Sequence, residues 1–188
     1  MAIRTFLALD LDAPIRRAIA DAAAGLPAGG AKVRWVEPQN LHVTMKFLGD
    51  VPDADVVNIC RTVEALAGGL DPLTFDVVGL ECTPDRGPVK MIWAAVRDLD
   101  GKLTEVFDGL EAALEVLGFD AERRAFRPHI TVGRVRYCPN PAALRQATAR
   151  LADEEFGAQN AGEIVVYSSQ LTREGPIYAA MAHCRLGR

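Results

Sequence analysis

Two short segments of the sequence hold residue types that suit acid–base chemistry. "LHVTMKFLGD" (41–50) contains His42 and Thr44, and "PHITVGRVRY" (128–137) contains His129 and Thr131. Each segment repeats the order His, apolar residue, Thr, apolar residue, at 42–45 and at 129–132. The chain has only three histidines, so a shared frame for two of them indicates a paired function.

Alternation along a β-strand decides where these side chains point. His42 and Thr44 share one face of a strand, as do His129 and Thr131, while the apolar residues between them face the other way. Two imidazoles across a cleft can divide acid–base work, since one accepts a proton while the other donates one. Threonine hydroxyls donate hydrogen bonds to an anion, and a phosphate group fits such a site.

Other chemistries have less support in the sequence. Two histidines without a third ligand make a poor zinc site, so we expect neither a metal nor a cofactor. The glycine-rich nucleotide loops and the G-x-S-x-G motif are absent. A lone strand histidine is usually structural, and we interpret His183 in "AHCRL", which lacks the frame, in this way.

The charge distribution favours a small anionic ligand over a long polyanion. Net charge is −4, but "RRAFRPHITVGRVR" (123–136) carries five arginines and no acid around the second motif. A local positive patch on an acidic protein suits a compact anion. The alternative is an ordinary solvated strand edge.

Hydrophobic periodicity predicts an α+β chain with two similar halves. Helices are expected at 13–26, capped by Asp12; at 53–70; at 100–118, capped by Asp100; and at 140–156, capped by Asn140. Strands are expected at 3–11, 73–82, 89–99, along both motif segments, and in a closing hairpin over 163–186 that turns at "REGP". Each half then reads strand, helix, motif strand, helix, strand, with one extra strand at the end.

The spacing of these elements indicates an internal duplication. The motif histidines are 87 residues apart, and Phe6 and Ile92, at matching places in the opening strands, are 86 apart. A pseudo-two-fold axis between such units would bring both motif strands to one shared cleft. We therefore expect residues 1–188 to form a single catalytic domain of two lobes.

The remaining features suggest a cytoplasmic protein. No apolar run is long enough for a membrane span, and the first residues do not resemble a signal peptide. Cys60, Cys82, Cys138 and Cys184 form no C-x-x-C pair, so reduced thiols are expected. We expect a monomer with no obligate protein partner and no membrane association.

Beyond single motifs, "VRWVEPQNLHVTMKFLGDV", "FRPHITVGRV" and "VVYSSQL" closely resemble the RNA 2′,3′-cyclic phosphodiesterases. This family, first named bacterial 2′-5′ RNA ligases, belongs to the two-histidine phosphoesterase superfamily with its H-x-T-x motif. The resemblance covers nearly the whole chain. It implies a bilobal α+β fold of two antiparallel sheets with flanking helices and the histidines in a central groove. It also implies metal-free opening of a 2′,3′-cyclic phosphate at an RNA end, such as that of a tRNA fragment, to a 2′-phosphate.

The same resemblance implies roles for individual residues. His42 would donate a proton to the departing ribose 3′-oxygen, and His129 would activate water. Thr44 and Thr131 would donate hydrogen bonds to the phosphate oxygens, and Arg134 would help to hold the phosphate.

Arg134 raises a geometric difficulty, because strict alternation puts it on the face opposite His129. Gly133 precedes it, where the family frequently has Ala, and a glycine inside a strand often marks a bulge that re-aims the next side chain. We take such a bulge as a hypothesis. Arg127, Phe47 and Trp35 are further candidates for groove contacts, which packing or edge exposure explains equally well.

Two other functions fit the same residues. A 2′-5′ RNA ligase would run the reverse reaction at the identical site. A module that binds RNA ends without turnover would keep the hydroxyls and the arginine, but it would not need a matched acid and base.

Overall fold

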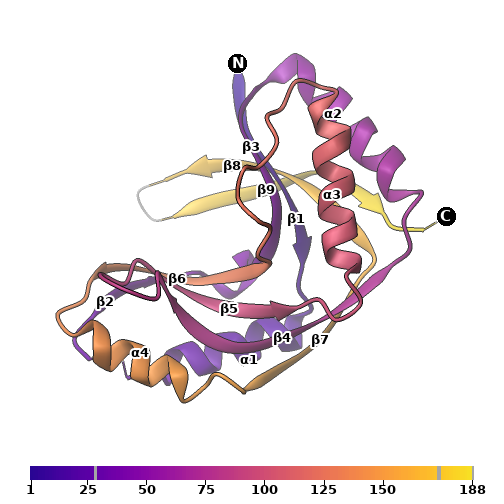
Figure 1. The fold of residues 1–188 in the computed structure, drawn as a ribbon. Coiled ribbons are helices and arrows are strands. Elements are labelled where there is room, and N and C mark those ends of the chain that lie inside the picture. Colours follow the sequence, from indigo (N-terminus) through magenta and orange to yellow (C-terminus); the bar gives the residue numbers. More distant parts are fainter. Residues whose placement is uncertain (28, 173–174, 188) are drawn as a thin grey trace.

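A computed structural model describes residues 1–27, 29–172 and 175–187 (Figure 1). In this part of the chain the helices are α1 (Ala13–Ala24), α2 (Asp53–Ala67), α3 (Lys102–Glu115), α4 (Pro141–Ala149) and the 3-10 helix η1 (Pro38–Asn40). The strands are β1 (Ala2–Asp10), β2 (Lys32–Trp35), β3 (His42–Pro52), β4 (Leu73–Thr83), β5 (Met91–Arg97), β6 (His129–Tyr137), β7 (Glu155–Ala161), β8 (Glu163–Leu171) and β9 (Pro176–Arg185). The predicted α+β class is confirmed.

The strands form one curled antiparallel sheet in the order β7-β4-β5-β6-β3-β1-β8-β9, with β2 added to β6. The order is symmetric about the junction of β6 and β3. On one side lie β3, β1, β8 and β9, and on the other lie β6, β5, β4 and β7. Both motif strands therefore occupy the centre of the sheet.

Helices pack on the two halves of the sheet separately. α2 and α3 contact each other and pack on β3, β8 and β9, whereas α4 packs on β4 and α1 packs on β7 (Figure 1). The two sides of the sheet, with their helices, form the two lobes. α1 and β4 come from the first half of the sequence but lie on the side of β6, whereas α3 and β8 come from the second half but lie on the side of β3.

Alternation and helical periodicity account for the core. Val43, Met45, Ile130 and Val132 are buried beneath the helices. α3 buries one stripe of apolar residues: Leu103, Val106, Phe107, Leu110 and Leu114. Each motif strand is thereby fixed by its apolar residues, which leaves the motif histidines and threonines on the opposite face.

Two helix starts illustrate how side chains set the boundaries. Asn140 caps α4 as predicted, since its Oδ1 accepts from the backbone N–H of Ala143 at 3.0 Å. The prediction that Asp100 caps the third helix is wrong, because the Asp98 carboxylate accepts from the first N–H groups of α3 at 3.1 and 2.9 Å. The N-cap position of that helix is Gly101, whose φ of 72° places it in the left-handed region.

One predicted helix is too long. The helix expected over 140–156 ends at Ala149, and residues 155–161 form β7, which pairs with β4. Residues 155–161 (EFGAQNA) contain a glycine and two amides but no β-branched residue, so they give no clear strand signal, and the pairing partner lies about 80 residues earlier in the chain. The closing hairpin is present as β8 and β9, while Arg173 and Glu174 of its predicted turn lie outside the described residues.

Candidate active site

A single pair of residues joins the two motif strands. Val43 of β3 pairs with Ile130 of β6 in antiparallel register, and both side chains are fully buried. Because neighbouring residues alternate, the pair places His42 and His129 together on the opposite face, each flanked by a motif threonine. We call this side of the sheet the motif face.

Both imidazoles are held in the same way. Nδ1 of His42 lies 2.8 Å from the Asn40 carbonyl oxygen, and Nδ1 of His129 lies 2.8 Å from the Arg127 carbonyl oxygen. A carbonyl only accepts, so each Nδ1 carries the hydrogen. Each Nε2 is therefore the nitrogen left to exchange protons with a ligand.

His42 lies in an aromatic cluster. Its ring is 5.1 Å from that of Phe6 and 5.5 Å from that of Tyr178, and Phe6 also stacks on Tyr167 at 5.3 Å. Burial lowers the pKa of His42 below 6.5, and a charge on His129 lowers it further. The Asn40 carbonyl and the Asp10 carboxylate oppose this by raising the same pKa.

His129 has different neighbours. It stacks on Trp93 with ring centroids 3.7 Å apart, and the Arg127 guanidinium lies 5.6 Å from the Trp93 ring. Arg127 in turn donates to both carboxylate oxygens of Glu81, at 2.8 and 2.9 Å. Burial lowers the pKa of His129, the Arg127 charge lowers it further, and the Arg127 carbonyl and Glu81 raise it.

A register shift re-aims Arg134 toward the motif face. Trp93 pairs with Thr131, but Ile92 pairs with Gly133, so β6 carries one extra residue at Val132. Arg134 then pairs with Met91, two residues before Trp93 on β5, and so shares the face of Trp93 and Thr131. Its guanidinium contacts Met91 Sδ at 3.8 Å, and its charge lowers the pKa of Tyr178, which burial raises.

A second arginine lies beside Arg134. Arg34 of β2 pairs with Arg134 in register, so the two side chains share one face. Neither has an acidic partner within the described residues. Two guanidinium groups side by side repel each other, so this part of the motif face favours an anion.

The other groove candidates have mixed positions. Trp35 packs on the strand behind Arg134, since a Cβ added to Gly133 would lie 2.8 Å from its ring. Phe47 is 67% exposed and only borders the aromatic cluster, 5.9 Å from Phe6. Arg127 is occupied by Glu81 and Trp93. None of the three has a contact that assigns it to a ligand.

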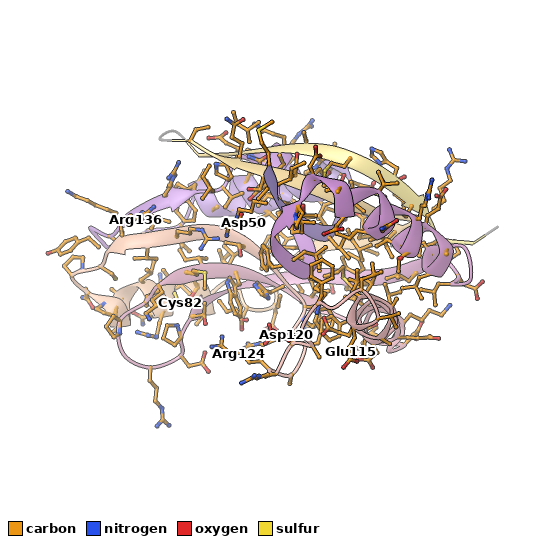
Figure 2. The ribbon with its side chains drawn as sticks, turned by 90° about the horizontal axis from the view of Figure 1, so that it is seen from above. Asp50, Cys82, Glu115, Asp120, Arg124 and Arg136 are labelled. Carbon is orange, nitrogen blue, oxygen red and sulfur yellow. The ribbon has the colours of Figure 1, made fainter. Side chains whose placement is uncertain are left out.

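The basic segment 123–136 does not form one patch. Figure 2 shows Arg136 well separated from Arg124. Arg127 is paired with Glu81, whereas Arg134 projects on the motif face. Therefore only some of the arginines in this segment add positive charge to the motif face.

A buried ion pair ties the two motif regions together. Lys46, on the strand of the first motif, is 7% exposed and lies 2.6 Å from Oε1 of Glu111 in α3. The same ammonium donates to the Asp120 carbonyl at 2.9 Å, and Oε2 of Glu111 accepts from the Glu122 N–H at 2.7 Å. These bonds anchor the segment that leads from α3 to His129.

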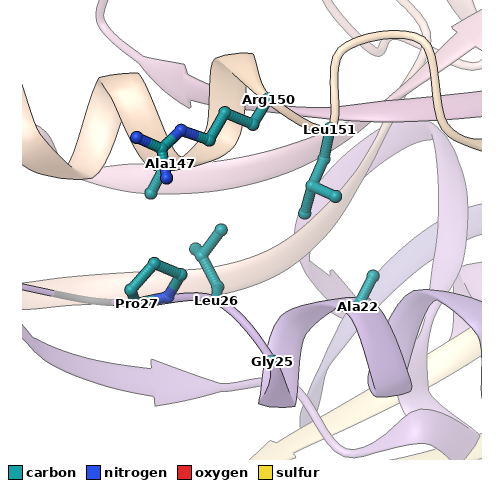
Figure 3. Close-up of a pocket in the computed structure, with 7 residues that line it drawn as sticks. All are labelled: Ala22, Gly25, Leu26, Pro27, Ala147, Arg150 and Leu151. Atoms are coloured by element: carbon teal, nitrogen blue, oxygen red, sulfur yellow. The ribbon is translucent and has the colours of Figure 1, made fainter.

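One cavity away from the motif face is lined by none of the predicted site residues. It has a volume of about 250 Å³ and lies between the end of α1 and α4, with Leu26 and Pro27 on one side and Arg150 and Leu151 on the other (Figure 3). Across the described ranges, no group of three His, Cys, Asp or Glu side chains is placed to hold a metal ion. In those ranges, too, every helix is too short or too polar to cross a membrane. His183 pairs with Glu163 on β8 at 2.8 Å.

Comparison with known proteins identifies the family of this chain. The model of the family described as LigT like Phosphoesterase matches residues 9–93 and again residues 95–178. The chain belongs to this family. The resemblance drawn from the sequence alone is thereby confirmed. The prediction that the protein is an enzyme of the phosphoesterase type is confirmed as well.

Two relatives of this LigT-like phosphoesterase extend along nearly its whole length. An RNA 2′,3′-cyclic phosphodiesterase of Methanothermobacter thermautotrophicus is 33% identical over 99% of this chain and 100% of its own. A protein of the same name from Methanocaldococcus jannaschii is 32% identical over 94% of this chain and 96% of its own.

Solved structures share the fold. TT0787 of Thermus thermophilus superposes with a TM-score of 0.82 at 24% identity, and each chain covers 97% of the other. E. coli LigT complexed with 3′-AMP gives a TM-score of 0.78 at 23% identity over the full length of both chains.

Some residues on the motif face were not foreseen. Asp10, Trp93 and Arg34 carry no motif, and each becomes a candidate only through its strand partner, which is His42, Thr131 and Arg134 respectively. Arg34 lies within the segment "VRWVEPQNLHVTMKFLGDV" that resembles the family, but nothing in that segment distinguishes it from its neighbours. Register between distant strands was the missing information.

Proposed function

We propose that this LigT-like phosphoesterase hydrolyses 2′,3′-cyclic phosphate ends of RNA to 2′-phosphomonoesters, with His42 and His129 as acid and base. The observation that supports this most is the Val43–Ile130 pair, which sets both imidazoles on one face with each Nδ1 bonded to a carbonyl. The names of the full-length relatives agree with this substrate.

In the proposed reaction His129 activates water. Its neutral Nε2 removes a proton as the water oxygen bonds to phosphorus. Burial and the Arg127 charge both lower the pKa of His129, which favours the neutral form that a base requires.

His42 completes the reaction on the other side of the phosphorus. The bond to the ribose 3′-oxygen breaks, and protonated Nε2 of His42 gives that oxygen its proton, leaving a 3′-hydroxyl and a 2′-phosphate. Attacking and leaving oxygens lie roughly in line in phosphoryl transfer, so an acid and a base must flank the phosphate. The proton taken by His129 and the one given by His42 balance, and solvent restores both side chains.

The remaining oxygens of the phosphate need donors. We propose that the Thr44 and Thr131 hydroxyls donate to the two non-bridging oxygens, and that Arg134 supplies positive charge as negative charge builds up there. The register shift at Val132 supports this role for Arg134, since it puts the guanidinium on the motif face.

Turnover of a short RNA with a 2′,3′-cyclic phosphate end tests the proposal. We expect a 2′-phosphate product, identified by its resistance to an enzyme that removes only 3′-phosphates. Binding without turnover would favour an RNA-end binding module instead. Joining to an RNA with a 5′-hydroxyl, with little hydrolysis, would favour the 2′-5′ ligase, in which the 5′-hydroxyl takes the place of water at the same groups and the 3′-oxygen again leaves.

Partners and location follow as further parts of the proposal. The partner is RNA with a cyclic phosphate end, such as a tRNA fragment, and we propose a monomer without a resident metal or cofactor. Cys60, Cys82, Cys138 and Cys184 are all free thiols, which supports a reducing compartment such as the cytoplasm.

A further inference from the structure

We propose that Asp10 decides which histidine acts as the acid, by favouring the protonated form of His42 over that of His129. Asp10 would be a positioning residue that acts through its charge and does not touch the reacting atoms. This inference rests on the proposed function and adds a residue that no motif contains.

The sheet places Asp10 directly beside His42. Asp10 is the last residue of β1 and pairs with His42 of β3 in antiparallel register, so both side chains lie on the motif face. Directly opposed residues have Cβ atoms about 4.5–5.5 Å apart. His42 Nδ1 is already bonded to the Asn40 carbonyl, so the carboxylate acts on the ring by its field.

A second set of contacts fixes the carboxylate. The Tyr167 hydroxyl lies 2.9 and 2.8 Å from the two Asp10 oxygens, and it can donate to either. Tyr167 stacks on Phe6, which also packs against His42. One aromatic cluster therefore holds both the carboxylate and the imidazole. Burial and the bond to Asp10 raise the pKa of Tyr167, so this hydroxyl stays a donor across the range in which histidine titrates.

The other motif lacks the equivalent acid. Ala95 of β5 pairs with His129 as Asp10 of β1 pairs with His42. The position opposite the motif histidine therefore holds a carboxylate beside His42 and a methyl group beside His129. The charges that act on His129 are instead the Arg127 guanidinium, which lowers its pKa, and the paired Glu81 carboxylate, which raises it. The two histidines share one frame but differ in their electrostatic surroundings.

The groups facing His42 come from several strands. They are Asp10 from β1, His129 from β6, Tyr178 from β9 and the Asn40 carbonyl that precedes β3. Among the residues that shift the pKa of His42, Asp10 is the one carboxylate. Its removal therefore takes away the main charge that favours the imidazolium.

The test is the pH dependence of kcat/KM for Asp10→Asn on an RNA with a cyclic phosphate end. Without the carboxylate, less His42 is protonated at high pH, whereas at low pH His42 is protonated in both proteins. We expect wild type and variant to converge on the acidic side and to differ by roughly 3- to 100-fold on the alkaline side, from one charge at about 6 Å. A loss that is equal at every pH would make Asp10 a structural residue and overturn the proposal.

Ala95→Asp provides the reciprocal test. A carboxylate beside His129 would keep the base protonated, so the loss should appear on the acidic side and vanish at high pH. Ala95→Asn adds similar bulk without charge, and it should not produce this pH-dependent loss. Ala95 is only partly buried, so the substitution has room and the test does not depend on the folding of Asp10→Asn. If Ala95→Asp lost activity on the alkaline side, the assignment of acid and base would be reversed and the inference would fail.

These outcomes are separable from failure of the proposed function. A wild-type protein without cyclic phosphate turnover would remove the proposed function itself. A wild-type protein with turnover and a pH-independent effect of Asp10→Asn would remove only the role of Asp10.

Discussion

Replacing Lys46 by Met should strongly destabilise this phosphoesterase. The ammonium lies 2.6 Å from Glu111 and 2.9 Å from the Asp120 carbonyl, and the Lys46 side chain is 6% exposed. Met fills similar space but leaves the Glu111 carboxylate without its counter-charge. Removing one partner of a buried ion pair typically costs about 3–5 kcal/mol. For a chain of this size that corresponds to a fall in Tm of roughly 6–20 °C.

Urea unfolding followed by circular dichroism measures this cost. Lys102 is an exposed lysine on α3, and Lys102→Met serves as the matched control, with an expected change within about 0.5 kcal/mol. Glu111→Gln should also destabilise, because, although the amide oxygen can still accept from Lys46, the amide nitrogen cannot accept from the Glu122 N–H and the buried ammonium loses its counter-charge. A change below about 1 kcal/mol for Lys46→Met would show that the pair is solvated, and the argument from burial would be wrong.

The remaining predictions concern the site. Turnover should survive EDTA, and its loss on chelation with recovery on adding a divalent ion would defeat the metal-free mechanism. Thr44→Ala and Thr131→Ala should each lower kcat/KM roughly 10–1000-fold with little change in Tm; a large drop in Tm would make that threonine structural. Arg34→Ala should leave the free protein at least as stable, because it relieves repulsion from a like charge, and a marked drop in Tm would contradict this. Burial lowers the pKa of His42 and His129 in the folded state, so the unfolded chain binds more protons at acid pH. The free energy of unfolding, measured by urea titration, should therefore fall as the pH drops below about 6.5. A free energy of unfolding that rises instead would contradict the lowered pKa values.

Local patterns predicted most elements of the fold. The stripe on α3, the cap at Asn140 and the alternation around Val43 and Ile130 each depend on residues close in sequence, so periodicity is enough. β7 was missed because its stability comes from pairing with β4, which local composition does not record. The Asp100 cap was wrong for a similar reason, since Asp98 reaches the same N–H groups from slightly earlier in the chain.

The site was predictable in part. His42, Thr44, His129 and Thr131 were identified by their frame, and their common face follows from alternation once the Val43–Ile130 pair is known. Their catalytic roles stay predictions. The duplication also stays a prediction, supported by the symmetric strand order and by two successive matches to one family model.

Features of the site that depend on strand register were harder to predict. The placement of Arg134 needed a bulge that Gly133 only suggested, and it became definite with the register of β5 and β6. Asp10 lies opposite His42 and Ala95 lies opposite His129, so the two motif histidines have different neighbours at the same position. No single segment of the sequence reveals this pairing.

The central claim is that His42 and His129 divide the acid and base work, and a change of leaving group tests it most directly. kcat/KM would be measured for His42→Ala and His129→Ala on an RNA with a cyclic phosphate end and on a nitrophenyl phosphodiester that wild type also hydrolyses. A ribose oxygen needs a proton to leave, whereas nitrophenolate does not, and general acid help is worth ~10²–10⁴-fold. We predict that His42→Ala loses this factor on RNA but much less on the nitrophenyl ester, while His129→Ala is slow on both. Equal losses for His42→Ala on the two substrates, or rescue of His129→Ala instead, would contradict the account.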